Sequence, residues 1–295
     1  MKHFSLNIKG RIVEYTNPVV MGIVNITPDS FYADSRVTAD ADIEVRAAQM
    51  VEQGADMLDI GAYSTRPGAD FVTAEEEMTR LKHGISAVRR AVGPDIPLSV
   101  DTFRADVARA CIVEWGADII NDISGGKLDE RMFETVAELR VPYVLMHTRG
   151  TPQTMQTMTD YDNVTADVVS ELQRSVWKLE ELGVADIIID PGFGFAKTLE
   201  QNYELLAGLP AFDILGKPLL AGMSRKSMFT RLLGIGADEA LLPTAVGNAL
   251  ALERGAAILR VHDVAAARQT VAVVEKMKKC QVQENFITFV DNKSI

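Results

Sequence analysis

Short runs of apolar residues recur along the chain, and each run ends in a polar residue or a glycine. The runs are rich in Val, Ile, Leu or Met, as expected for strands buried on both faces of a sheet. Eight of them are Val19–Asn25, Met57–Gly61, Pro97–Asp101, Ala117–Asn121, Pro142–His147, Asp186–Asp190, Pro218–Ser224 and Ala257–His262. Their ends lie roughly 20 to 45 residues apart, which is enough for a helical crossover to a parallel neighbour. The pattern predicts an α/β fold, a (β/α)8 TIM barrel.

Helical patterns alternate with these runs. Apolar residues recur on one helix face from Asp42 to Gln53. Thr73 followed by Glu76 resembles a capping box, and it predicts a helix that runs to about Val92. Further helices are predicted at residues 105–114, 130–139, 165–182, 199–206, 226–232, 244–254 and 265–279.

The ends of the chain add little to this plan. Leu6–Ile8 and Arg11–Tyr15 flank Lys9-Gly10, which predicts a β-hairpin over residues 4–16 that plugs the bottom of the barrel. No linker or second domain is evident, so residues 1–295 are interpreted as a single domain with the barrel at about 18–279. The tail at 281–295 follows, and residues 286–289 suggest an edge strand within it.

Three of the predicted strands end in an acid or an amide that we expect to point at a shared space, at Asp101, Asn121 and Asp190. Barrels of this kind keep their chemistry at the C-terminal ends of the strands. A carboxylate there can accept two parallel N–H bonds from a flat heterocycle, and an amide both donates and accepts. The three side chains therefore favour a template for a polar ring. The alternative is that each caps the next helix or fixes a loop.

Cations follow the last two strands, in Ser224-Arg225-Lys226-Ser227 and in Arg260-Val261-His262-Asp263. Loops in this position commonly bind phosphate, and a helix that starts near Ser224 would add N–H groups for an anion. For Arg225 an ion pair at the surface is an equal alternative. His147 and His262 are isolated and lack HxH or HExxH spacing, so we expect no zinc site built by the protein.

Three loops could cover such a site. Residues 26–36 and 62–69 are longer than a tight connection and carry Pro and small polar residues, as lid loops often do. The run Asp190–Phe195 contains two glycines, which permit close backbone approach, and two phenylalanines. These rings either wall a flat ligand or fill the core.

Composition narrows the class of protein. The chain has 295 residues, 47% of them hydrophobic, and a net charge of −11, which argues against a general nucleic-acid binder. Two cysteines make a disulfide framework improbable and fit a reducing compartment. The chain shows neither a signal-peptide pattern at its start nor an apolar stretch that could span a membrane, so we expect a cytoplasmic enzyme.

These motifs together resemble the dihydropteroate synthase family, in order from about residue 18 to 279. The sequence departs from the usual family pattern at Gly61-Ala62-Tyr63, where Gly-Gly-Glu is common, and at Phe31–Ser35. The resemblance rests on Met21–Phe31, Asp59–Gly61, Ser64–Gly68, Ser99–Thr102, Asn121–Gly126, Met146-His147, Gly150–Pro152, Asp190–Phe195, Ser224–Ser227 and Arg260–Asp263.

The resemblance implies condensation of 6-hydroxymethyl-7,8-dihydropterin diphosphate with p-aminobenzoate, with Mg²⁺, in a homodimer that is a sulfonamide target. The implied catalytic residues are Asp29, Arg66, Lys226 and Arg260. The implied pterin site is Asp101, Asn121, Ile123, Met146, Asp190, Lys226 and Arg260. The diphosphate would lie among Asn25, Arg66, Arg260 and His262, with Asn25 as the metal ligand. The p-aminobenzoate would lie among Phe31, Thr65, Pro67, Phe195 and Ser224.

Two other functions are compatible with a pterin template. A pterin-dependent methyltransferase would use methyltetrahydrofolate and pass a methyl group to a corrinoid partner. A non-catalytic homologue would bind the pterin diphosphate without releasing diphosphate. The Ser-Thr-Arg-Pro-Gly and Ser-Arg-Lys-Ser motifs favour the synthase, and the presence of Asn25, Arg66, Lys226 and Arg260 disfavours a non-catalytic homologue.

Overall fold

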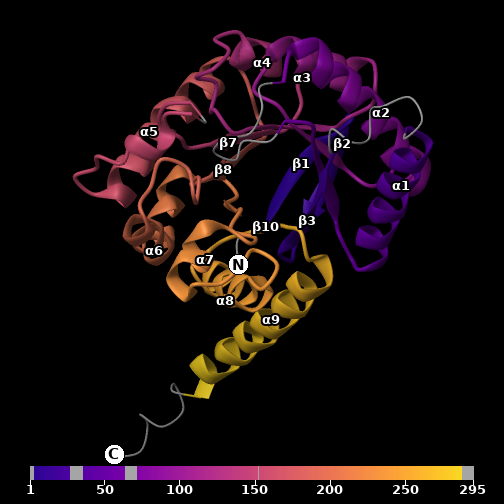
Figure 1. The fold of residues 1–295 in the computed structure, drawn as a ribbon. Coiled ribbons are helices and arrows are strands. Elements are labelled where there is room, and N and C mark those ends of the chain that lie inside the picture. Colours follow the sequence, from indigo (N-terminus) through magenta and orange to yellow (C-terminus); the bar gives the residue numbers. More distant parts are fainter. Residues whose placement is uncertain (1–2, 27–35, 64–71, 152, 288–295) are drawn as a thin grey trace, which may run out of the picture.

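The chain folds into a barrel of parallel strands surrounded by helices (Figure 1). The computed structural model describes residues 3–26, 36–63, 72–151 and 153–287, with side chains omitted at 36–39 and 281–287. Within this part, the strands of the barrel are β3 (Val19–Asn25), β4 (Met57–Gly61), β5 (Leu98–Asp101), β6 (Ile119–Asp122), β7 (Tyr143–Met146), β8 (Ile187–Asp190), β9 (Leu220–Ala221) and β10 (Ile258–Val261).

These eight strands lie in the order β8-β7-β6-β5-β4-β3-β10-β9, and every pairing is parallel. A further parallel bridge between Ile189 and Leu219 joins the two ends of the sheet, which confirms the predicted barrel. The helices are α1 (Arg36–Glu52), α2 (Ala74–Val92), α3 (Ala105–Val113), α4 (Met132–Leu139), α5 (Val164–Glu181), α6 (Leu199–Ala207), α7 (Ser227–Leu233), α8 (Leu241–Glu253) and α9 (Val264–Ile287), with 3₁₀ turns η2 (Met155–Thr157) and η3 (Leu209–Leu215).

Sequence patterns predicted most of these bounds, and the exceptions have physical reasons. The Thr73 hydroxyl accepts the Glu76 N–H, so α2 begins where its N-cap was predicted. The edge strand predicted at 286–289 is wrong for residues 286 and 287, because α9 continues through Ile287 with no Pro or Gly after residue 264 to end it. Strand β9 is only two residues long, since Pro218 has no N–H for a ladder.

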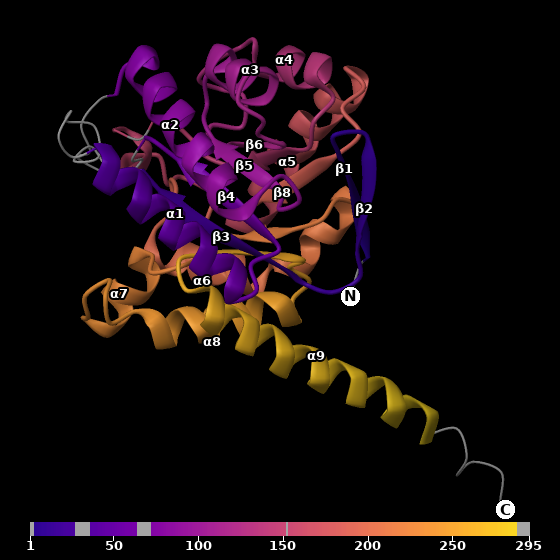
Figure 2. The same ribbon diagram turned by 90° about the vertical axis from the view of Figure 1, so that its right-hand side faces the viewer.

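The predicted hairpin, β1 (Phe4–Ile8) and β2 (Arg11–Tyr15), lies beside one end of the barrel in Figure 2. Leu6 and Ile8 are buried there in one cluster with inward-facing strand residues that include Met21 and Met57. The hairpin thus closes the end opposite the strand C-termini, and it leaves the other end for chemistry. Among the described helices, none is both long and apolar enough to cross a membrane.

We expect Leu6→Ala to lower the free energy of unfolding by about 2–4 kcal/mol, because Leu6 is 1% exposed and the truncation leaves a cavity in the plug. Denaturant titration measures this change. Ile12→Ala on the same hairpin is the control, since Ile12 is 67% exposed and its truncation should change stability little. Equal effects of the two substitutions would show that the hairpin does not seal the barrel.

Candidate active site

The acidic and amide residues predicted from the strand ends share one rim of the barrel. Asp101 is paired in register with Asn121, and Asp190 with Met146. Neighbouring strands β5 and β6, and β7 and β8, therefore present these residues at the same level. Asn121 and Asp190 are buried, and the Asp101 side chain is 15% exposed.

Arg260 on β10 organises the centre of this rim. Its Nε donates to Asp59 Oδ2 at 2.7 Å, and its Nη2 donates to Asp101 Oδ2 at 2.9 Å. Asn121 Nδ2 also donates to Asp59 Oδ2, at 3.1 Å. Asp59 is fully buried, and its Oδ1 has no hydrogen-bond partner among the described residues.

Asp59 is a site residue that the pattern of polar strand ends does not predict. It lies inside β4, two residues before the strand ends, on the side that faces Arg260. The available signal was a carboxylate in the middle of an otherwise apolar run, which needs a partner when it is buried.

Burial changes the protonation of Asp101 beside this shared guanidinium. Burial raises the pKa of Asp101 to about 7; Arg260 opposes this rise and Asp59 adds to it. Burial lowers the pKa of Arg260, but the Asp59 and Asp101 charges outweigh burial, so the net shift is upward and the guanidinium stays charged. The cluster can therefore offer a ligand carboxylate acceptors beside a permanent cation.

Asp190 and Lys226 form the second polar centre. Asp190 Oδ1 accepts the Gly192 N–H at 2.8 Å, and Lys226 Nζ donates to the Phe193 carbonyl oxygen at 2.5 Å. Lys226 Nζ also lies 4.6 Å from the centre of the Phe195 ring. Burial lowers the pKa of Lys226 to about 8, against the opposing charge of Asp190, while burial raises the pKa of Asp190.

Ile123 and Met146, which the resemblance implies as pterin walls, are buried. Phe195, which it implies for p-aminobenzoate, is half-buried. Ile123 and Phe195 also line a small, partly open cleft of about 210 Å³, counted together with the solvent at its mouth. The cleft is further lined by Ser124, Leu128, Thr148, Gly150 and Met155.

The predicted anion corner has a more specific structure than its motifs indicated. The Ser224 hydroxyl contacts the His262 backbone N–H and Nδ1, at 3.1 and 3.0 Å. Arg225 forms a two-pronged ion pair with Asp263, so the ion-pair alternative holds for this residue. The helix starts at Ser227, close to the predicted range 226–232 but after Ser224, and Lys226 is its N-cap. Asn25, at the end of β3, is exposed.

Several predicted residues cannot be placed in this arrangement. They lie outside the described residues and are Asp29, Phe31, Thr65, Arg66 and Pro67. At the edge of this gap, the Tyr63 ring packs edge-on against Phe103, at 5.3 Å between centroids. The Arg104 guanidinium lies 5.6 Å from the centre of the Tyr63 ring, so Tyr63 is anchored where the family commonly has glutamate.

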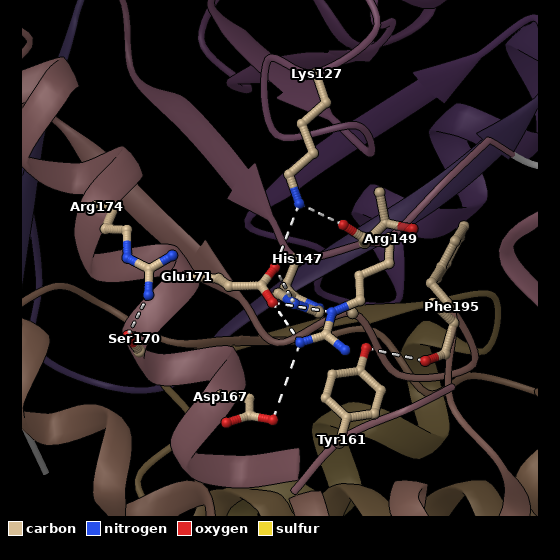
Figure 3. A network of polar contacts seen from close by, with 12 residues as sticks. Lys127, His147, Arg149, Tyr161, Asp167, Ser170, Glu171, Arg174 and Phe195 are labelled. Carbon is tan, nitrogen blue, oxygen red and sulfur yellow. Dashed lines mark hydrogen bonds and ion pairs between the residues drawn. The ribbon is translucent and has the colours of Figure 1, made fainter. Parts of the chain in front are cut away.

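His147, which was singled out only as isolated, belongs to a buried polar network (Figure 3). Its Nε2 lies 3.2 Å from Glu171 Oε2, and its Nδ1 lies 3.1 Å from the ammonium of Lys197. Arg149 also pairs with Glu171, and its guanidinium stacks 3.8 Å from the Tyr161 ring. Among the described residues, no three His, Cys, Asp or Glu side chains are grouped to hold a metal ion.

Comparison with known proteins agrees with this geometry. A family model described as pterin binding enzyme matches residues 21–262. Dihydropteroate synthase from Synechocystis is 42% identical over 88% of this chain and 89% of the relative, and that from Escherichia coli K12 is 39% identical over 90% and 94%.

Solved structures give the same result. Xanthomonas albilineans dihydropteroate synthase with 4-aminobenzoic acid superposes with a TM-score of 0.84 at 40% identity, covering 93% of this chain and 98% of that one. A Yersinia pestis dihydropteroate synthase with a sulfonamide drug gives 0.83 at 35% identity, with 94% and 100% covered.

The barrel and the family match over residues 21–262 define a pterin-binding enzyme. Within that class, the chain belongs to the dihydropteroate synthase family, and it is a transferase.

We expect the network at His147 to make stability depend on pH. Burial, together with the Lys197 charge, lowers the pKa of His147 to about 4, against the opposing effect of Glu171. Because the unfolded value is about 6.5, the unfolded chain binds more protons between these limits. The stabilisation is complete above a pH of about 6.5 and is lost as the pH falls through the folded-state pKa, by about 3 kcal/mol.

Chemical denaturation across this pH range measures the effect. His147→Gln should flatten the acid limb, because it removes the titrating ring. His83→Gln is the control, since His83 is exposed and should leave the wild-type profile intact. Parallel profiles for His147→Gln and wild type would contradict the assignment.

Proposed function

We propose that this chain joins 6-hydroxymethyl-7,8-dihydropterin diphosphate to p-aminobenzoate, releasing diphosphate and 7,8-dihydropteroate, with the residues of the strand-end site in the roles below. The observation that carries this proposal is the paired polar centre at one rim, with Asp190 beside Lys226 and Arg260 between Asp59 and Asp101. Xanthomonas albilineans structures contain 4-aminobenzoic acid and 7,8-dihydropteroate, which supports the same substrates here.

The pterin ring would be recognised by hydrogen bonds along its edges. The carboxylate of Asp190 would accept the 2-amino group and the adjacent ring N–H, as a carboxylate accepts a fork of donors. Asp101 and Asn121 would pair with the other ring atoms, and Lys226 would donate to the ring. The Arg260 guanidinium would lie against the ring face, where a planar cation stacks well.

Asn25 suits the role of a metal ligand. Mg²⁺ keeps several waters and uses few protein oxygens together with substrate phosphates. A single exposed amide oxygen at the end of β3 fits that donor set, so Asn25 would hold the ion. When bound, the ion would neutralise charge on the diphosphate and make it a better leaving group. His262, Arg66 and Arg260 would bind the same diphosphate.

The chain's residues would act mainly by positioning and electrostatics. Loss of diphosphate leaves positive charge on the exocyclic carbon of an electron-rich dihydropterin, so an SN1-like course is favoured. Asp29 on the loop after β3 would stabilise that charge, and the two long loops would exclude water. The arylamine would then attack the cation, with no covalent enzyme intermediate.

The second substrate would lie at the outer side of the pterin. Phe31, Thr65 and Pro67 on the long loops, with Phe195, would surround its ring, and Ser224 and the start of α7 would receive its carboxylate. Because the Yersinia pestis relative was solved with a sulfonamide drug, we propose that sulfonamides bind in the same place.

We further propose a cytoplasmic homodimer. The described cysteines, Cys111 and Cys280, are unpaired, which fits a reducing compartment. Exposed apolar side chains gather on two neighbouring helices of the barrel, and such a patch is typical of an interface. They are Leu232 and Leu233 on α7 with Leu241, Leu242, Val246 and Leu250 on α8.

Diphosphate release tests the reaction. It should require the pterin diphosphate, p-aminobenzoate and Mg²⁺ together, and 7,8-dihydropteroate should form in equal amount. Methyl transfer from methyltetrahydrofolate to cobalamin would instead support the methyltransferase. Binding of the pterin diphosphate with no release of diphosphate when p-aminobenzoate is added would support a non-catalytic homologue.

Asp190→Asn should weaken binding of 6-hydroxymethylpterin by about 100-fold or more in calorimetry, because one acceptor of the fork becomes a donor. Asp186→Asn is a matched control on the same strand segment, at the opposite end of the barrel, where Asp186 accepts the Asn7 N–H. It should leave pterin affinity unchanged. An unchanged affinity in Asp190→Asn would refute the assignment of Asp190 to the ring edge.

The double substitution Leu242→Glu with Val246→Glu should convert the dimer to a monomer in sedimentation velocity, because it places charges in an apolar contact. Leu242 is 74% exposed and Val246 54% exposed, so the monomer should stay folded. A wild-type protein that sediments as a monomer at micromolar concentration would contradict the proposed interface.

A further inference from the structure

The loop from Pro191 to Ala196 lies outside the helices and strands, so the hydrogen bonds of a helix or sheet do not support its backbone. Gly192 and Gly194 have φ of +73° and +79°, and Ala196 has φ of +50° although it carries a side chain. A Cβ on Gly192 would lie 1.9 Å from the His147 carbonyl oxygen, so this loop passes against the end of β7. A loop of this shape needs other groups to hold it in place.

Side chains supply most of the bonds that hold its carbonyl oxygens. Lys197 Nζ donates to the carbonyl oxygens of Gly192 and Phe195, each at 3.0 Å. The Tyr161 hydroxyl donates to the Ala196 carbonyl oxygen at 3.0 Å. The remaining held carbonyl is that of Phe193, which accepts from Lys226, a residue of the proposed pterin site.

Lys197 is therefore the internal brace of the loop. Its side chain is buried, and the third bond of its ammonium is to His147 Nδ1 at 3.1 Å. An ammonium has three donors, and here these carbonyls and the imidazole accept all three. His147 must then accept at Nδ1 and carry its proton on Nε2, which faces Glu171.

The bracing network continues outward to the protein surface (Figure 3). Glu171 on α5 accepts from Arg149 as well as facing His147, and it lies 3.5 Å from Lys127 Nζ. Lys127 also donates to the Thr148 carbonyl oxygen at 2.6 Å. Strand β7, helix α5 and the loop after β6 are thus tied together behind Lys197.

Stability alone does not account for a lysine at this position. None of the three partners of its ammonium is a carboxylate, and burial lowers the pKa of Lys197 to about 7, against the charge of Asp190. An ammonium buried without a carboxylate partner is costly, because burial removes its hydration and no opposite charge replaces it. What the ammonium provides is a fixed separation between three acceptors.

The spacing of these three acceptors controls the direction in which Asp190 and Lys226 point. The Gly192 N–H, one peptide away from the carbonyl that Lys197 holds, donates to Asp190 Oδ1. The Phe193 carbonyl oxygen, between the two carbonyls bound by Lys197, receives Lys226. We propose that Lys197, oriented by His147, is a positioning residue that fixes this loop so that Asp190 and Lys226 meet the pterin in the correct geometry. The inference rests on the proposed function.

The first test is Lys197→Met, which keeps the length of the side chain and removes its three hydrogen bonds. Calorimetry with 6-hydroxymethylpterin should show affinity weakened at least about tenfold, since displacement of about 1 Å at a binding group has effects of this size. In turnover, KM for the pterin diphosphate should rise and KM for p-aminobenzoate should change less. The loss of affinity should exceed what any fall in melting temperature explains. Lys178→Met on the exposed face of α5 is the control and should match wild type in all these measurements.

A second pair of variants keeps Lys197 in place. In His147→Asn, the amide oxygen lies near the position of Nδ1 and can still accept from Lys197, whereas the Glu171 contact is lost. In His147→Gln, the amide reaches the position of Nε2, so the Glu171 contact remains and the Lys197 acceptor is lost. We expect near wild-type pterin affinity in His147→Asn and the Lys197→Met defect in His147→Gln.

The opposite order, or equal affinities in both variants, would overturn the proposal. So would Lys197→Met with wild-type pterin affinity, or with a loss fully explained by a lower melting temperature. If the wild-type protein itself fails to bind the pterin, the proposed function is refuted independently of these variants. If Lys197→Met does not fold, the His147 pair still tests the positioning role.

Discussion

Arg260 holds together the charged rim on which the rest of the site depends. Its guanidinium joins Asp59 on β4 to Asp101 on β5, although β3 lies between β10 and β4. Without this cation, a fully buried carboxylate would be left without a compensating charge, which typically costs several kcal/mol. The arrangement of the strand ends and the charge balance of the rim therefore depend on the same residue, Arg260.

The same arrangement leaves acceptor oxygens for a ligand that donates N–H bonds, as the proposed pterin would. Two carboxylates that share one cation leave acceptor capacity on the buried floor, and Asp59 Oδ1 has no partner among the described residues. The second centre repeats the design with Asp190 and Lys226. In both centres, burial raises the pKa of an aspartate, and a neighbouring cation limits the rise. In each case, a ligand that donates hydrogen bonds to the carboxylate would replace the hydrogen bonds of the water that burial removes.

The sequence predicted the elements well where one physical rule dominated. Strands β3 and β4 have the predicted bounds because parallel strands buried on both faces are apolar throughout and end at a change of polarity. Asp101, Asn121 and Asp190 were found by the same rule, since they mark those ends. The structure brings them together with Arg260 and Lys226, which the resemblance placed in the same site.

Sequence patterns could not identify the roles of other residues. Asp59 was missed because it lies within a strand, where only its burial and its bond to Arg260 reveal its part. Lys197 follows a loop motif and has no sequence mark that distinguishes a buried brace from a solvated lysine. The pairing of Arg225 with Asp263 joins two loops distant in the chain, so no local spacing could settle its role.

We propose that the rim around Arg260 binds the pterin ring. A crystal structure of the protein soaked with 6-hydroxymethylpterin tests it most directly. We expect the 2-amino edge of the ring on the Asp190 carboxylate and Lys226 Nζ within hydrogen-bonding distance, with Arg260 still bridging Asp59 and Asp101. A ring bound elsewhere, or bound at this rim without contact to Asp190, would contradict it.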